Sequence, residues 1–207
     1  MEKAMRMKHQ EGFSLIELLI VMLIILVIAA MSIPGFQAIQ KYLRISGDAR
    51  SLYSLAGQAK MQAASQFTHA RLRMSLQKGT YWIEMWNKST NQWQVLHGTQ
   101  YFSTGVSAGT GTIAAPPANT QNVLAQAPVC YANDPSTLWW GYALDPSGDV
   151  CMEFNSRGVP VDYWGNPTGN DALYITDGNS VYGLTVNAAG MVQGWTINMN
   201  SANWTKR

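Results

Sequence analysis

Gly12, Phe13 and Glu17 are the residues whose types and spacing point most directly to chemistry. Glu17 places a carboxylate inside an apolar segment, where a charged side chain costs on the order of 2.5–3.5 kcal/mol on insertion scales. Nothing in the apolar run that follows can neutralise it. Cleavage between Gly12 and Phe13 would create an α-amino group four residues before Glu17. In two copies packed side by side, one copy's carboxylate could pair with the other's ammonium, and Glu17 would then set the axial register of an assembly.

The apolar run that holds these residues is long enough to cross a membrane as a helix. Leu18 to Ile33 contains sixteen consecutive residues without a charge, and the stretch from residue 13 contains 21. At about 1.5 Å per residue, such a helix spans the hydrocarbon layer of roughly 30 Å. Lys3, Arg6 and Lys8 precede it and should keep its N-terminal end in the cytoplasm. The alternative that Glu17 simply lies at the wet membrane interface stays open.

The segment Gly12-Phe13-Ser14-Leu15-Ile16-Glu17-Leu18-Leu19-Ile20-Val21 resembles the class III signal of type IV pilins and type II secretion pseudopilins. In that family a prepilin peptidase removes a short basic leader after the glycine and methylates the new N-terminal phenylalanine. The resemblance implies cleavage between Gly12 and Phe13, N-methylation of Phe13 and an assembly role for Glu17. Pro34 matches the helix-kinking proline of many members. The resemblance covers the first 36 residues, and a conventional secretory signal cut near residues 29–32 is the alternative.

Periodicity and resemblance together predict a chain of four parts. Residues 1–12 are a cleaved leader, 13–34 the transmembrane and filament-core helix, 35–67 its amphipathic continuation and 68–207 a periplasmic β-rich domain. Leu72, Met74 and Leu76 alternate with polar residues and predict a strand with one buried face. The pair Asp177-Gly178 predicts a hairpin. The expected fold class is α+β, a pilin-like fold with the long N-terminal helix packed on an antiparallel sheet.

Residues 103–128 are rich in Ser, Thr, Gly, Ala, Pro and Asn and are expected to form a long loop, with room for a short strand near residues 111–115. Cys130 and Cys151 lie in the part placed outside the cytoplasm, where a disulfide closing a loop of about 20 residues would contribute roughly 3 kcal/mol. Two free or buried thiols are the alternative. His9, His69 and His97 are scattered, so neither a metal nor a cofactor is expected.

The sequence contains no pattern that predicts catalysis. No phosphate-binding loop, His-Glu metal pattern or nucleophile elbow is present. Asp171 and Asp177, with Asn170 and Asn179, could imitate a calcium loop but fit turn chemistry better. We therefore expect a structural subunit and not an enzyme.

Two ligand-binding alternatives remain. The net charge of +2 does not by itself indicate nucleic-acid binding. A DNA-binding minor pilin would nevertheless need cations on one face. The candidate cations are Arg71, Arg73, Lys78, Arg157, Lys206 and Arg207. A surface for an exoprotein, a carbohydrate or a sister pilin could instead be formed by Trp139, Trp140, Tyr142, Tyr163, Trp164 and Trp204, although such aromatic clusters are more often core or subunit interface.

Local patterns narrow the resemblance to the GspH/FimT type of minor pseudopilin or pilin. They are a helix rich in Ala and Gln that ends near a basic strand, a turn at residues 153–158 and a final hairpin turn at residues 187–192. The resemblance implies a single-pass inner-membrane protein, later built into a type II secretion pseudopilus or a type IV pilus as a minor component supporting secretion. Its expected partners are prepilin peptidase, other pilins or pseudopilins, the inner-membrane assembly platform and, before assembly, the lipid bilayer. The alternative is a minor pilin that binds DNA or another ligand at the pilus surface or tip.

Overall fold

A computed structural model describes residues 12–132, 144–162 and 164–207, and it divides the chain into two compact units, Met1–Gln40 and Lys41–Arg207. The described residues contain one helix, α1, Leu15–Ser65, whose first half belongs to one unit and whose second half belongs to the other. Every strand in the described ranges belongs to the second unit.

The described part of the first unit is almost entirely helix. Its Leu, Ile, Val, Ala and Met side chains leave the backbone as the only hydrogen-bonding group over many residues, and an α-helix satisfies that backbone internally. By length and composition α1 could cross a membrane, and no other helix in the described residues could. The helix continues through Pro34 and Gly35. The kink at Pro34 stays a prediction.

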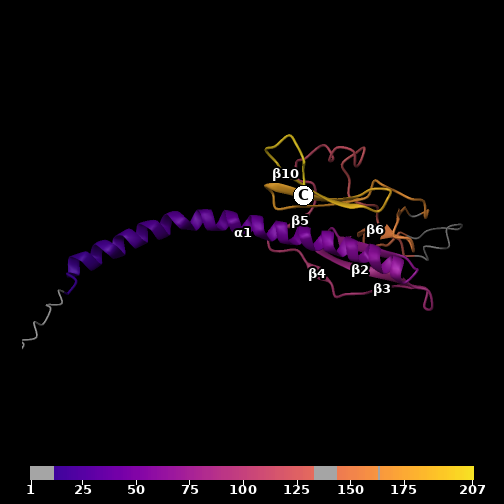
Figure 1. Cartoon of the computed structure of the whole chain (residues 1–207), viewed down its shortest axis with the longest axis horizontal. Helices are drawn as coiled ribbons and strands as arrows, with labels where there is room; N and C mark the ends of the chain where they lie inside the picture. Colours follow the sequence, from indigo (N-terminus) through magenta and orange to yellow (C-terminus); the bar gives the residue numbers. More distant parts are fainter. Residues whose placement is uncertain (1–11, 133–143, 163) are drawn as a thin grey trace, which may run out of the picture. The chain divides into compact units, whose positions relative to one another are not determined.

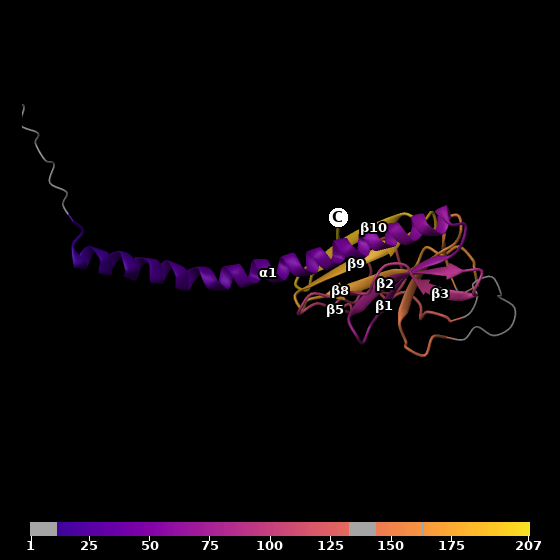
Figure 2. The same cartoon turned by 90° about the horizontal axis from the view of Figure 1, so that it is seen from below.

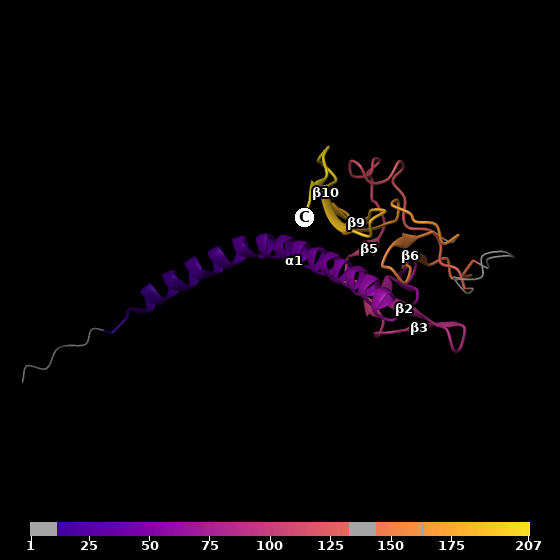
Figure 3. The same ribbon diagram turned by 45° about the vertical axis from the view of Figure 1, so that its right-hand side comes forward.

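The second unit contains two antiparallel sheets (Figure 1). The strands are β1 Ala70–Ser75, β2 Thr80–Asn87, β3 Gln92–Val95, β4 Gln100–Tyr101, β5 Ser107–Ala108, β6 Val150–Phe154, β7 Pro160–Val161, β8 Ala172–Thr176, β9 Ser180–Val186, β10 Val192–Asn198 and β11 Thr205–Lys206. One sheet has the order β3-β2-β1-β6-β7, with β4 also paired to β2, and the other has the order β11-β10-β9-β8-β5. Figure 3 shows the β2–β3 hairpin extending past the C-terminal end of α1.

The second half of α1 packs against both sheets and supplies one wall of the main core. Ile45, Leu52 and Leu55 are buried there beside the small residues Ala56, Ala59 and Ala63. Leu72 of β1 and Leu184 of β9 belong to the same cluster. Figure 2 shows this half of the helix crossing the strands of both sheets. The α+β architecture predicted from the sequence, a long helix packed on antiparallel strands, is therefore confirmed.

Three detailed predictions about strands and turns can be compared with the structure. Asp177-Gly178 does turn the chain between β8 and β9, and Gly178 has the positive φ of +84° that favours glycine. The prediction that β1 buries only one face is wrong, because Arg71 is as deeply buried as Leu72 and Met74. No strand forms at residues 111–115; the short strand in this loop is β5, which pairs with β8.

The two cysteines are joined in the structure. The Cys130–Cys151 disulfide has a Cα–Cα distance of 5.0 Å and links residues 21 apart in sequence. Both sulfurs are buried beside β1, since Cys151 lies opposite Arg73 in the β1–β6 ladder. Closing a loop of this length removes conformational freedom from the unfolded chain and contributes about 3 kcal/mol in the chain-entropy model.

Candidate processing and assembly site

Ser14 and Glu17 form the N-terminal cap of α1. The Glu17 backbone N–H donates to the Ser14 side-chain oxygen at 3.2 Å and to the Ser14 carbonyl oxygen at 3.1 Å. Ser-x-x-Glu is the spacing of a capping box, in which the serine hydroxyl satisfies a backbone donor that the helix leaves unpaired. Glu17 thus lies in the first turn, where the helix dipole favours a negative charge. The helix therefore begins at Leu15, with Ser14 as its N-cap and Glu17 in its first turn.

The apolar face that follows has no partner within a single copy of the chain. Every large apolar side chain described between Phe13 and Ile33 is at least 47% exposed. A folded soluble surface rarely leaves so much contiguous apolar area in water. This exposed segment lies in the helix that is long and apolar enough to cross a membrane.

In the second unit, Arg71 and Arg73 of β1 belong to a cluster of ion pairs. Arg71 Nε donates to Glu84 Oε2 at 2.7 Å across the β1–β2 ladder, and its Nη1 donates to the Tyr131 carbonyl at 2.7 Å. Its guanidinium stacks 3.9 Å from the centre of the Trp93 ring. Arg73 contacts Glu84 at 3.3 Å, and it contacts Asp145 and Asp149 at 2.8 Å each.

These contacts speak against the predicted role of Arg71 and Arg73 in nucleic-acid binding. Arg71 is 1% exposed, and Glu84 beside it is also buried. Phosphate contacts require cations that are free to reach the ligand, whereas these two guanidinium groups face carboxylates inside the domain. Sequence reasoning placed both side chains on one face of a strand correctly, but it could not see that the face is covered.

The other basic candidates are exposed and lie apart from this cluster. Arg157 follows β6 in a tight turn whose Asn155 side chain accepts from its backbone N–H. Lys206 stands 5.9 Å from the Trp195 ring centre. Arg207 donates to the hydroxyl oxygens of Tyr42 at 3.2 Å and Tyr182 at 3.4 Å. A role of these three residues in binding nucleic acid stays a prediction.

Two of the aromatic candidates and all of the calcium candidates lie in the described residues. Trp139, Trp140, Tyr142 and Tyr163 lie outside the described residues. Trp164 is 46% exposed, whereas Trp204 contacts Tyr174 and donates to the Ala115 carbonyl. Asp177 accepts from the backbone N–H groups of Asn179 and Ser180, which is turn chemistry. In the described ranges no three His, Cys, Asp or Glu side chains gather to hold a metal ion.

Asp171 is the buried acid whose ionisation the fold disfavours most clearly. It precedes β8, is 6% exposed, and no donor in the described part of the chain reaches its Oδ2. Burial, followed by repulsion from Asp162 and Glu153, raises the pKa of Asp171 from 3.8 to about 7. The folded state therefore holds a proton that the unfolded chain releases at lower pH.

This raised pKa predicts a loss of stability as pH increases. Since the folded-state pKa lies above the unfolded value, the folded state is favoured while Asp171 is protonated, and this advantage disappears between about pH 4 and pH 7. From about pH 5.5 to about pH 7 we expect the free energy of unfolding to fall by about 2 kcal/mol through this group. Asp171→Asn should remove that part of the slope in urea unfolding at several pH values. An unchanged slope would contradict the assignment.

Two features of this molecule were missed by sequence reasoning. The spacing Ser14-x-x-Glu17 could have been recognised in the sequence as a capping box, and it would have placed the start of the helix at Leu15. A cavity between α1 and the five-stranded sheet could not be predicted from the sequence, because it depends on which side chains of the helix face which side chains of the strands.

The comparison with known families adds one finding to this geometry. Residues 7–33 match the prokaryotic N-terminal methylation motif. No curated protein and no solved structure matches the chain. Together with the apolar helix and the α+β fold, this motif supports a prepilin-like chain of the pilin or pseudopilin type. The motif implies processing by prepilin peptidase and assembly with other pilins. Subunits of this kind are generally structural and not enzymatic, and the motif and apolar helix suggest a membrane anchor.

Proposed function

We propose that this chain is a minor, GspH/FimT-like subunit that prepilin peptidase cuts between Gly12 and Phe13 and methylates at Phe13. The processed chain leaves the inner membrane to enter a type II secretion pseudopilus or a type IV pilus, with residues 68–207 on the periplasmic side. The observation that carries the proposal is the methylation motif directly before an apolar helix that has no partner in a single copy.

The same geometry supports Glu17 as the residue that fixes assembly. It stands in the first turn of α1, within one turn of the new amino terminus at Phe13. In a bundle of apolar helices the dielectric constant is low, so an ammonium from a neighbouring copy is attracted to the carboxylate far more strongly than in water. Only one axial offset between neighbouring helices brings these two groups together, and that offset defines the filament register.

The minor-subunit assignment rests on the Ala- and Gln-rich helix and on the two short turn patterns. Asn155 and Asn187 each accept backbone N–H groups through Oδ1, and each turn ends in a glycine of positive φ, Gly158 and Gly190. Both turns lie against Lys60 of α1, whose Nζ donates to the Gly190 carbonyl at 2.8 Å. Both turns therefore lie beside the same side chain near the end of the helix.

Mass spectrometry of the intact chain, expressed with and without a prepilin peptidase, tests the proposal. We expect a peptidase-dependent product that begins at Phe13 and carries one N-methyl group. Gly12→Val should block cleavage, because a branched side chain would stand at the scissile bond. Gly35→Val is the matched control and should be processed normally, since a Cβ meets nothing within 4 Å at either glycine. A cut after the apolar run, or none at all, would overturn the proposal.

A further inference from the structure

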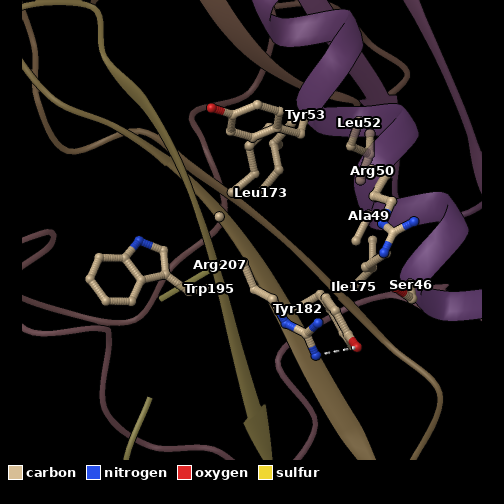
Figure 4. Close-up of a pocket in the computed structure, with 13 residues that line it drawn as sticks. Ser46, Ala49, Arg50, Leu52, Tyr53, Leu173, Ile175, Tyr182, Trp195 and Arg207 are labelled. Atoms are coloured by element: carbon tan, nitrogen blue, oxygen red, sulfur yellow. Dashed lines mark hydrogen bonds between the residues drawn. The ribbon is translucent and has the colours of Figure 1, made fainter. Parts of the chain in front are cut away.

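A cavity of about 420 Å3 lies between the second half of α1 and the five-stranded sheet (Figure 4). Its helix side is formed around Ala49 and Leu52, and its sheet side around Leu173, Ile175 and Leu184. This volume is near the lower end of the range of small-molecule sites, about 300–1,000 Å3. The cavity therefore has room for one short aliphatic chain rather than for a lipid with two.

Gly194 of β10 helps to keep this cavity open. A Cβ at this position would stand 3.6 Å from Cβ of Arg207 and 4.0 Å from Cδ2 of Tyr53, both of which line the cavity. The glycine is not required by the backbone, since its φ is not in the positive range where glycine is favoured. Its lack of a side chain leaves space between Tyr53 and Arg207.

Two guanidinium groups are the charged groups of the cavity. Arg50 projects from α1 and Arg207 approaches from the strands, as Figure 4 shows. Both are exposed, and neither forms an ion pair with a carboxylate in the described residues. The Arg207 guanidinium donates hydrogen bonds to the hydroxyl oxygens of Tyr42 and Tyr182, and it lies 5.9 Å and 5.6 Å from the centres of their rings. Asp48, the nearest acid along α1, is occupied by the backbone N–H and hydroxyl of Ser103.

We propose that this cavity binds a straight-chain fatty acid, with the aliphatic chain against Leu173, Ile175 and Leu184 and the carboxylate between Arg50 and Arg207. Burial of the chain supplies the hydrophobic contribution. Guanidinium groups recognise carboxylates through charge-assisted, bidentate hydrogen bonds, and the absence of acidic lining residues makes the entrance selective for an anion. The site is independent of Gly12, Phe13 and Glu17.

Calorimetric titration of decanoate into the full chain in phosphatidylcholine nanodiscs, with empty nanodiscs subtracted, tests this site. We expect saturable binding of one decanoate per chain and at least tenfold weaker binding of decanol. Arg50→Gln combined with Arg207→Gln should weaken decanoate binding at least tenfold. Gly194→Val should abolish it by filling the cavity, and valine suits a strand.

Lys78→Gln is the control, because Lys78 is an exposed cation that does not line the cavity. It should bind decanoate as the unaltered chain does, and thermal melting of each variant checks that the domain is folded. The proposal is overturned if the folded chain shows no saturable binding, if decanol binds as tightly as decanoate, or if the double arginine variant retains full affinity.

Discussion

Glu17→Val is expected to abolish incorporation of the chain into filaments while leaving membrane insertion and cleavage after Gly12 intact. Valine removes an intramembrane charge, so the helix should insert at least as readily as before. In the filament, the amino group of a neighbouring Phe13 would lose its carboxylate, and an unpaired buried charge costs several kcal/mol per subunit. We therefore expect at least a tenfold loss of assembled chain, measured by recovery in sheared or cross-linked filaments.

Ser14→Ala separates this assembly effect from the capping role of the same turn. It removes the hydroxyl that accepts from the Glu17 backbone N–H and should cost about 1 kcal/mol of helix stability. The carboxylate stays in place, so assembly should continue. If Glu17→Val assembled like the unaltered chain, or if Ser14→Ala failed to the same degree, the pairing of Glu17 with a neighbouring amino terminus would be wrong.

Arg71→Met is expected to destabilise the second unit by about 3–5 kcal/mol, the range for breaking one half of a buried ion pair. Methionine leaves Glu84 buried, with only the more distant Arg73 contact and the Trp82 indole N–H as partners. It also leaves the Tyr131 carbonyl without the donor that Arg71 supplies. Urea unfolding followed by tryptophan fluorescence measures the loss.

The double variant Arg71→Met with Glu84→Leu tests whether the loss of stability comes from the Glu84 charge that is left buried without Arg71. Replacing both partners by apolar side chains of similar size is often close to neutral, so much of the stability should return. Arg157→Met is the matched surface control and should change the free energy of unfolding by less than about 0.5 kcal/mol. A single-variant loss below about 1 kcal/mol would show that the Arg71–Glu84 pair contributes little.

The sequence by itself determined the features that depend on neighbouring residues. The apolar run before residue 34, the acid within it and the glycine before Phe13 indicate an anchor and a processing signal without any tertiary contact. The helical period past Pro34 and the Asp177-Gly178 turn likewise depend on local spacing, and α1 and the β8–β9 hairpin confirm them. The α+β fold class followed from the order of these elements.

Only the tertiary structure decided which faces are covered and which charges meet. Alternation along β1 predicted one solvated face, but Trp93 and the Tyr131 segment lie over Arg71, and the Tyr131 contact joins residues 60 apart in sequence. The raised pKa of Asp171 and the cavity at Gly194 have the same origin. Burial and electrostatic interactions depend on the distance between groups in space, and for these groups that distance is set by the packing of α1 and the two sheets.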